Sequence, residues 1–175
     1  MSLDPECRLC PLWHDRIQVV PPSGDRLSKV ALVGEAPGAK EDEIGRPFVG
    51  RAGRTLDKLM QEAGLDREKV MITNTVKCRP PENRRPSPKE ALACRPYLLE
   101  ELAGKRLVLA LGISAAEGLL DRKVVMKDSA NQLFDVELNG LKLKVMVTYH
   151  PSACIYTPGA KDVLREALRT AVTYL

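Results

Sequence analysis

The sequence predicts an α/β fold, a three-layer αβα sandwich in which helices cover both faces of a parallel sheet. Three observations predict it. Four short apolar runs, rich in β-branched residues, are typical of strands that are buried on both faces. Segments with helical periodicity lie between these runs and after the last one. Strands that alternate with helices in this way are typical of a sheet sandwiched between two helical layers.

The four apolar runs have the length of buried strands. They occupy residues 29–34, 70–76, 106–112 and 144–149. The dipeptide Asn139-Gly140 lies between segments of alternating apolar residues, so it predicts a β-hairpin that leads into the last strand.

Four helices are expected between and after these strands. The first is an amphipathic helix that ends at Gly64, with an apolar stripe of Leu56, Leu59, Met60 and Ala63. The second begins at Ser87, where Ser87 and Glu90 have the spacing of a capping box and Pro88 takes the first helical position. A short helix follows over residues 113–120. The last helix carries the apolar stripe Val163, Leu164, Ala167, Leu168 and Ala171.

Composition limits the class of protein. The 175 residues fit a single domain over residues 1–175, and 44% hydrophobic with 29% charged residues is typical of a globular chain. No apolar run approaches the roughly 20 residues of a membrane span, and the first residues lack the features of a signal peptide. We therefore expect a cytoplasmic protein that is not associated with a membrane. The net charge of +4 suits a nucleic-acid-binding protein but equally many ordinary enzymes.

Polar residues follow three of the predicted strands at their carboxyl ends. Glu35 comes after the first strand, Asn74 ends the second and His150 follows the last. Because ligands of α/β sheets bind beyond the carboxyl ends of the strands, these segments are expected to converge on one cleft. A buried Asn74 amide needs partners, either a structural hydrogen bond or the edge of a base. A lone histidine is more often structural than catalytic, but this position favours a functional role.

Residues 34–53 contain five glycines, two prolines and four carboxylates, which predicts a long loop. Phe48 lies in this polar segment, where it either stacks on a base or anchors the loop to the core. Residues 79–88 are rich in proline and carry Arg79, Arg84 and Arg85. That segment is expected to be a rigid basic loop that contacts phosphates, and the alternative is an ordinary solvated surface.

Four of the five cysteines have spacings that suggest a thiolate site. Cys7 and Cys10 form a C-x-x-C pair, and Cys78 and Cys94 follow farther along the chain. Zinc and a [4Fe–4S] cluster both accept four cysteines, and the wide second spacing favours the cluster over a zinc ribbon. The alternative is that some of these cysteines are small buried apolar residues. Cys154 has no partner in spacing and is expected not to be a ligand.

Taken together, these segments resemble the family 4 uracil-DNA glycosylases, which carry an iron–sulfur cluster. The resemblance runs from Cys7 to about Tyr156 and rests on three motifs in order: GEAPG with ED and GRPFVGRAG, then TNTVKCRPPENRRP, then HPS. It implies four parallel strands in the order 2-1-3-4. It also implies that Cys7, Cys10, Cys78 and Cys94 hold one [4Fe–4S] cluster.

The resemblance assigns roles to single residues. It implies that Phe48 stacks on uracil, that Asn74 reads its Watson–Crick edge and that His150 contacts its O2. Glu35 and Glu41 occupy the acidic positions of the first motif and, with His150, are the expected catalytic residues.

Two positions of the first motif, and the last motif, depart from better-known relatives. Gly38 occupies the place of a bulky tyrosine that excludes thymine, and Ala36 the place of an aspartate that activates water, so both are expected to line the uracil site. Ser152, Cys154 and Ile155 belong to the last motif and are expected to contact DNA. The residue that fills the gap left by the flipped base is one of Cys154, Ile155 and Tyr156.

The implied activity is that of a monofunctional DNA-repair glycosylase, which flips uracil out of single- or double-stranded DNA and hydrolyses its N-glycosidic bond. Such an enzyme is expected to act as a monomer. One alternative is a non-catalytic nucleic-acid-binding module of the same fold with a structural metal site. Another is a hydrolase-like enzyme that uses Glu35 or Glu41 on a phosphorylated small molecule, although the sequence lacks a Walker motif.

Overall fold

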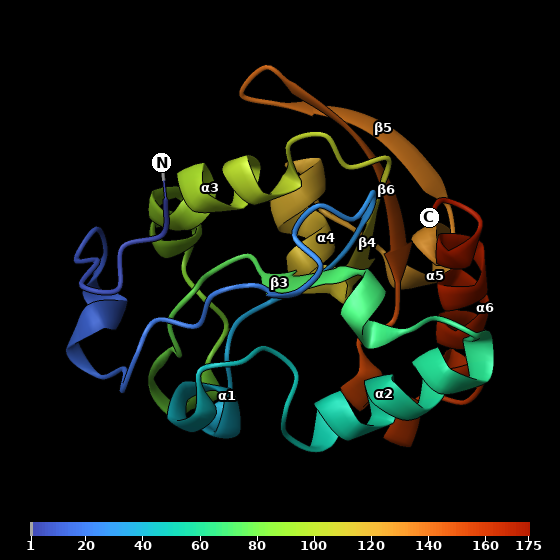
Figure 1. Ribbon diagram of the computed structural model, residues 1–175, viewed down its shortest axis with the longest axis horizontal. Helices are drawn as coiled ribbons and strands as arrows, with labels where there is room; N and C mark the ends of the chain where they lie inside the picture. Colours follow the sequence, from blue (N-terminus) through green and yellow to red (C-terminus); the bar gives the residue numbers. More distant parts are fainter. Residues whose placement is uncertain (1) are drawn as a thin grey trace.

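A six-stranded sheet runs through the centre of the computed structural model, which describes residues 2–175 (Figure 1). Its strand order is β1-β3-β2-β4-β6-β5. The strands are β1 (Ser23–Gly24), β2 (Val30–Gly34), β3 (Met71–Asn74), β4 (Leu107–Leu111), β5 (Leu133–Leu138) and β6 (Leu141–Thr148). The four central strands are parallel and lie in the expected order. The expectation of four strands was too low, because short antiparallel strands pair with both edges.

Helices cover both faces of the sheet, which confirms the three-layer sandwich (Figure 1). Helices α2 (Arg51–Ala63) and α6 (Ala160–Val172) pack on one face, and α3 (Pro88–Leu102) and α4 (Ile113–Leu120) on the other. The short elements are α1 (Ala39–Ile44), α5 (Met126–Ser129), η1 (Pro11–His14), η2 (Arg67–Lys69), η3 (Pro81–Asn83) and η4 (Pro151–Ile155). No helix within residues 2–175 is long and apolar enough to cross a membrane.

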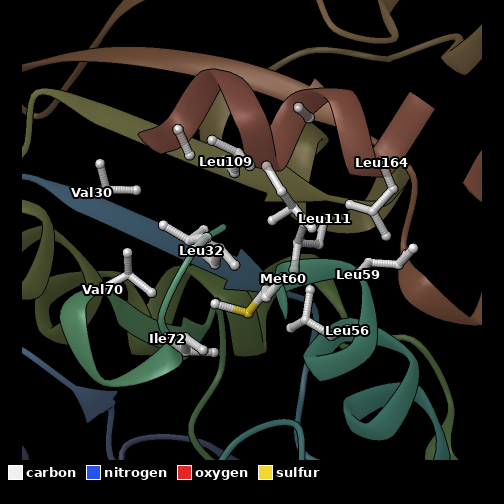
Figure 2. Packing of buried hydrophobic residues seen from close by; sticks show 14 of the residues in the cluster. Val30, Leu32, Leu56, Leu59, Met60, Val70, Ile72, Leu109, Leu111 and Leu164 are labelled. Atoms are coloured by element: carbon white, nitrogen blue, oxygen red, sulfur yellow. The ribbon is translucent and has the colours of Figure 1, made fainter. Parts of the chain in front are cut away.

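Each central strand divides its side chains between two cores. Val30 and Leu32 of β2 pack toward α2 and α6 (Figure 2), whereas Ala31 and Val33 pack toward α3 and α4. All four are fully buried. Because successive side chains of a strand point to opposite faces, a run that is apolar at every position needs a helix on each side.

The ends of the elements follow their local sequence. The Ser87 hydroxyl accepts a hydrogen bond from the Glu90 backbone N–H at 3.2 Å, and the Glu90 carboxylate accepts one from the Ser87 N–H at 2.8 Å. Gly64 ends α2 with a φ of +76°. Asn139 and Gly140 both have positive φ and form the two-residue turn between β5 and β6. The predicted capping box, helix stop and hairpin are therefore confirmed.

The prediction of one long loop over residues 34–53 is wrong. This segment contains α1, and α2 already begins at Arg51. Gly45 ends α1 with a φ of +83°, and the Glu41 side chain accepts a hydrogen bond from the Gly38 N–H at its start. The glycines therefore lie at the ends of two helices and do not prevent the helices from forming. The connection between the two helices is only six residues long.

Candidate functional site

A cleft opens at the carboxyl ends of β2, β3 and β6 and encloses about 920 Å³, open solvent at its mouth included. The segments after these three strands meet there, as the sequence predicted. Phe48, Asn74 and His150 are the side chains with the most distinctive chemistry. The cleft is lined by Glu35, Ala36, Pro37, Gly38, Glu41, Phe48, Gly50, Arg51, Ala52, Gly53, Asn74, Pro80, Asn83, Arg84, His150 and Ser152.

Asn74 is the last residue of β3 and is only 4% exposed. Its side-chain amide lines the cleft and forms no hydrogen bond with any residue in the range 2–175. Leaving a buried polar group without a partner costs about 1–3 kcal/mol. An amide at this position therefore has both its donor and its acceptor available to a ligand.

Phe48 lies beside Asn74 across a glycine. A Cβ atom on Gly34 would come within 2.5 Å of both the Asn74 Oδ1 atom and the Phe48 ring. Any side chain at residue 34 would therefore push the amide and the ring apart. The Phe48 ring is buried and packs partly against the core, and its centroid lies 5.7 Å from that of the His150 ring. Phe48 thus both anchors its segment and presents its ring to the cleft.

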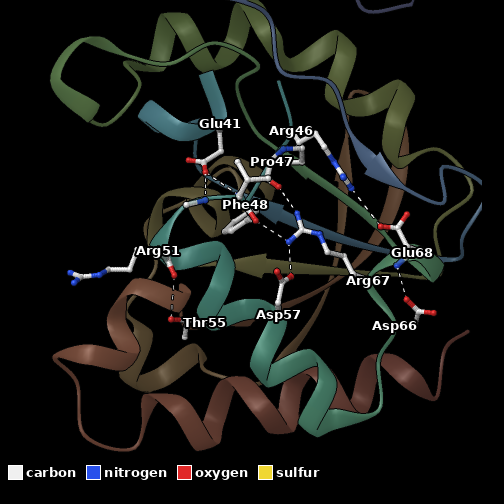
Figure 3. A network of polar contacts seen from close by, with 12 residues as sticks. Glu41, Arg46, Pro47, Phe48, Arg51, Thr55, Asp57, Asp66, Arg67 and Glu68 are labelled. Atoms are coloured by element: carbon white, nitrogen blue, oxygen red, sulfur yellow. Dashed lines mark hydrogen bonds and ion pairs between the residues drawn. The ribbon is translucent and has the colours of Figure 1, made fainter. Parts of the chain in front are cut away.

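The backbone of Phe48 has a φ of +52°, in the left-handed region. For a residue with a side chain, this conformation costs roughly 1–2 kcal/mol. The Phe48 carbonyl packs directly against Gly53, where a Cβ atom would approach its oxygen to 1.9 Å. The same carbonyl accepts a hydrogen bond from Arg67 (Figure 3). Surrounding contacts therefore hold an unfavourable backbone conformation in place.

His150 is held in one tautomer by the segment that follows it. Its Nδ1 atom accepts a hydrogen bond from the Ser152 backbone N–H at 3.1 Å, and the Ser152 hydroxyl lies 2.7 Å away. A backbone N–H can only donate, so Nδ1 carries no proton and the neutral ring carries its proton on Nε2. Burial lowers the pKa of His150 from 6.5 to about 4, although the negative charge of Glu41 opposes this shift.

The Glu41 carboxylate holds the two ends of the segment from residue 38 to residue 50 together at the edge of the cleft. One carboxylate oxygen accepts from the Gly38 N–H at 3.0 Å, and the other accepts from Val49 at 3.0 Å and Gly50 at 2.7 Å. A Cβ atom on Gly38 would lie 2.8 Å from the Glu41 carboxylate, so a bulky residue at 38 would displace it. Both oxygens of Glu41 are therefore committed to backbone groups.

Glu35 differs from Glu41 in this respect. Its backbone carbonyl accepts hydrogen bonds from Thr75 and Val76, which join the ends of β2 and β3. Its side chain lines the cleft and has no hydrogen bond or ion pair with any residue in the range 2–175. Ala36 also lines the cleft and packs on its other side against the apolar residues around Cys78. Of the two glutamates, Glu35 has the carboxylate that is available to a ligand or a water molecule.

The three arginines expected in one basic loop face different ways. Arg84 lines the cleft, but its guanidinium forms two hydrogen bonds with Glu90, at 2.7 and 2.9 Å. Arg85 pairs with Glu117 at 2.9 Å and lines a separate groove. Arg79 donates to the Asn83 side chain at 2.8 Å.

Arg51 at the start of α2 is a cation of the cleft that sequence reasoning did not assign to the site. Its side chain is exposed and has no ion pair among the described residues. Its place in a run of arginines at residues 46, 51 and 54 was the only signal in the sequence. Asn83 and Pro80 also line the cleft and were likewise missed.

The segment after His150 presents some side chains and hides others. Ser152 is exposed and lines the cleft. Ile155 and Tyr156 are 55% and 79% exposed, whereas Cys154 is only partly exposed and packs against the core below α2 and α6. The geometry thus leaves Ile155 and Tyr156, rather than Cys154, protruding from this segment.

The second candidate site is a cavity that collects all four cysteines of the predicted cluster. Cys7, Cys10, Cys78 and Cys94 line it with mostly apolar neighbours. All are free thiols, and burial raises the pKa of Cys94 to about 12. Within residues 2–175, no three Cys, His, Asp or Glu side chains are placed to share one metal ion. Four cysteine thiolates are a donor set that a [4Fe–4S] cluster accepts, as zinc does.

Two cations border this cavity, and neither was assigned to it from the sequence. Arg16 donates to the Cys7 carbonyl at 2.6 Å and lies 3.5 Å from the Cys78 sulfur. Lys77 is 1% exposed and bonds the Asn74 carbonyl at 2.6 Å and Glu101 at 2.6 Å. One segment therefore borders both sites: Asn74 lines the cleft, and Lys77 and Cys78 line the cysteine cavity.

Comparison with known proteins places the chain among DNA-repair enzymes. The sequence profile described as the uracil DNA glycosylase superfamily matches residues 21–172. A type-4 uracil-DNA glycosylase of Saccharolobus solfataricus is 40% identical over 171 residues, which cover 94% of this chain and 79% of the relative. A type-4 uracil-DNA glycosylase of Pyrobaculum aerophilum is 39% identical, with coverage of 93% and 86%. One of Thermotoga maritima is 44% identical, with coverage of 84% and 77%.

Proposed function

Because this chain belongs to the uracil DNA glycosylase superfamily, and within it to the type-4 enzymes, we propose that it removes uracil from DNA. The reaction is hydrolysis of the N-glycosidic bond, which leaves an abasic site in the strand. The alternative of a non-catalytic module of the same fold is not favoured, since the relatives are named as glycosylases.

One observation carries the proposal. The buried Asn74 amide faces the cleft without a hydrogen bond to any residue in the range 2–175, and the Phe48 ring and a histidine that carries its proton on Nε2 line the same cleft. A flipped uracil offers a donor at N3 and acceptors at O2 and O4. Asn74 would accept from N3–H and donate to O4, which satisfies both halves of an otherwise costly buried amide. Cytosine presents the opposite donor and acceptor at these two positions, so the same amide would reject it.

Phe48 would stack on the plane of the base. Its ring is already buried and fixed by Gly34, Gly53 and the core, so it loses little freedom when the base enters. Flipping costs a few kcal/mol and costs least where the base is mispaired, as uracil is opposite guanine.

His150 would stabilise the departing base. As the C1′–N1 bond breaks, positive charge develops on the sugar and negative charge on uracil, part of it at O2. The neutral Nε2–H of His150 would donate to O2, and one such preorganised donor is worth about 3–4 kcal/mol. The bonds from Ser152 to Nδ1 keep the ring in this tautomer before the substrate arrives.

Glu35 would position the attacking water. Its carboxylate lines the cleft without a partner among the described residues, whereas the Glu41 carboxylate already holds three backbone N–H groups. Ala36, at the position of the aspartate of other relatives, has no group that could take this task. Glu41 would instead keep Gly38 and the loop up to Gly50 in place against the base.

Cys7, Cys10, Cys78 and Cys94 would hold one [4Fe–4S] cluster. When bound, it would supply a structural cross-link between the N-terminal segment, the segment after β3 and helix α3. Arg16 and Lys77 would balance part of the negative charge that four thiolates bring into an apolar cavity. Free thiols at all five cysteines also suit a reducing, cytoplasmic location.

DNA would lie across the mouth of the cleft. Arg51, Arg84 and Ser152 line the cleft and would contact phosphates there, and Arg79 and Arg85 would contact phosphates farther along the strand. Ile155 or Tyr156 would enter the gap left by the flipped base, because both protrude beside Ser152. We also propose that the protein acts as a monomer.

The test is incubation of the purified protein with end-labelled oligonucleotides that contain one uracil, followed by alkali and a denaturing gel. Strand scission at the uracil position, and none in matched oligonucleotides with thymine or cytosine, supports the proposal. Intact strands with an iron-loaded, folded protein would overturn it.

A further inference from the structure

Arg67 lies outside the cleft, yet it holds the peptide that carries Phe48 (Figure 3). Its guanidinium donates to the Phe48 carbonyl at 2.9 Å and to the Pro47 carbonyl at 2.5 Å. It also forms an ion pair with Asp57 of α2 at 2.6 Å. We infer that Arg67 is a positioning residue that fixes the Phe48 ring for stacking on the base, an inference that rests on the proposed uracil glycosylase function.

We call the contacts of Arg67 with Phe48, Pro47 and Asp57 the Arg67 clamp. The Phe48 peptide needs this clamp because its backbone conformation is unfavourable. Phe48 has a φ of +52°, and its carbonyl is pressed against Gly53. Pro47 and Phe48 are both buried, and their successive carbonyls accept hydrogen bonds from Arg67 of η2, whose side chain is only 16% exposed. The guanidinium supplies donors to both carbonyls, so the bend at residues 47–48 stays closed and the ring stays turned toward Asn74 and His150.

The geometry calls for an arginine rather than another cation. A planar guanidinium has five donors in a fixed fork, so it can bond two adjacent carbonyls and a carboxylate at once. A lysine ammonium at this position could reach Asp57 or one carbonyl, but it could not hold all three in one plane. Asp57 in turn anchors the fork to α2, the helix whose first turn borders the cleft.

Loss of the clamp is expected to slow the reaction without touching the groups that contact the base. A misplacement of about 1 Å far from the chemistry can cost about 10²-fold in rate. We therefore expect Arg67→Met to lower the single-turnover rate of uracil release by about 10²-fold. Free uracil should also inhibit this variant more weakly, because the stacking surface is displaced.

Arg165 provides a matched control. It bonds Glu62 of α2 at 2.6 Å and Asp162 at 2.7 Å, and its side chain is 19% exposed, against 16% for Arg67. Arg165→Met therefore removes one carboxylate contact to α2, as Arg67→Met does, and one contact within α6, but none to the Phe48 peptide. It should match Arg67→Met in its effect on thermal unfolding and keep the wild-type rate.

The decisive experiment is a double-mutant cycle with Phe48→Leu, assayed by single-turnover release of uracil from an oligonucleotide and by inhibition with free uracil. If Arg67 acts through Phe48, Arg67→Met should lower the rate about 10²-fold in the wild-type background and less than about threefold in the Phe48→Leu background. Arg67→Lys should give an intermediate rate. Should Arg67→Met not fold, Arg67→Lys and Asp57→Asn complete the same cycle.

Equal losses in both backgrounds, or an Arg67 variant with wild-type rate and uracil inhibition, would overturn the inference. Failure of the proposed function is a different result: wild-type protein would release no uracil at all. A wild type that is active and an Arg67→Met protein that loses only as much as Arg165→Met would leave the function standing and remove the clamp.

Discussion

The cleft and the cysteine cavity lie on either side of one segment, residues 74–78, and differ in how complete they are. In the cleft, His150 and Glu41 are fixed by hydrogen bonds, and Phe48 is fixed by packing. In the cysteine cavity, four thiols lie among mostly apolar neighbours, and Arg16 donates a hydrogen bond to the Cys78 sulfur. The side chains of the cleft are therefore oriented by the protein itself, whereas the four thiols of the cavity are proposed to be ligands of a cluster.

This difference indicates a division of labour. A site that performs chemistry benefits from groups that are already oriented, because orientation is then not paid for during the reaction. A site that binds a structural metal group can be shaped by the group it binds. Variants in the two regions should therefore fail in different ways.

Cys78→Ala should have the largest effect, and it should be an effect on folding. A structural metal site contributes on the order of 10 kcal/mol in small metal-dependent domains. We expect the variant to lose iron, absorbance near 400 nm and much of its thermal stability, while Cys154→Ala keeps all three. Metal analysis and thermal unfolding check this, and stoichiometric zinc without iron in anaerobically purified wild type would contradict it.

Asn74→Asp should have the next largest effect, and here the fold should persist. An ionised aspartate presents two acceptors where uracil requires a donor and an acceptor. Sites built to pair a polar group reject the wrong partner by about 10⁴–10⁵-fold, so uracil release should fall on the order of 10⁴-fold. Weak cytosine release is expected from the protonated form. Full uracil activity with wild-type iron content would make Asn74 a structural residue.

Replacement of Arg79 and Arg85 should weaken DNA binding moderately, and to the same extent for every DNA sequence. If both contact phosphates, replacing both with Gln should weaken binding uniformly and flatten the slope of log K against log salt by about 0.9 per contact for duplex DNA. Arg84→Gln provides a comparison, since that side chain is tied to Glu90. Binding titrations between low and moderate salt measure the slope, and an unchanged slope would place the loop away from DNA.

The smallest expected effect is that of pH on the rate of uracil release. Burial lowers the pKa of His150 to about 4, so the folded protein keeps the ring neutral while the unfolded chain takes up a proton below its ordinary pKa of 6.5. The rate of uracil release should stay flat from pH 8 to about 5. The stability that depends on the neutral ring is fully present above pH 6.5 and is lost as the pH falls toward 4. Urea unfolding of wild type and His150→Gln over this range should show the difference, and a rate that halves near pH 6.5 would contradict it.

Much of the fold was predictable because burial on both faces leaves a strong signal. The central strands contained largely apolar runs, Ser87 and Gly64 marked the start and the end of two helices, and Asn139-Gly140 marked a turn between strands. Strand β1 was missed because its two residues, Ser23 and Gly24, carry no apolar signal. Helix α1 was missed because flanking glycines obscured a run, AKEDEI, that is made largely of good helix formers.

The site was predictable as far as the strand ends define it. Asn74 and His150 could be placed in one cleft because parallel strands end at the same edge of the sheet. The Arg67 clamp and the buried Lys77 could not be predicted, because each depends on contacts between charged side chains and segments that only the tertiary structure brings together. The common cavity of the four cysteines was expected from the family resemblance, since spacing alone left zinc open.

The most direct test of the division between cleft and cavity is the single-turnover rate of uracil release by His150→Ala, measured on protein of known iron content. We expect the single-turnover rate to fall by about 10²–10³-fold, the scale of one lost oxyanion donor. The iron content, the thermal stability and the affinity for uncleavable DNA should not change. A variant that binds DNA poorly but cleaves at the normal single-turnover rate would contradict it and make His150 a docking residue.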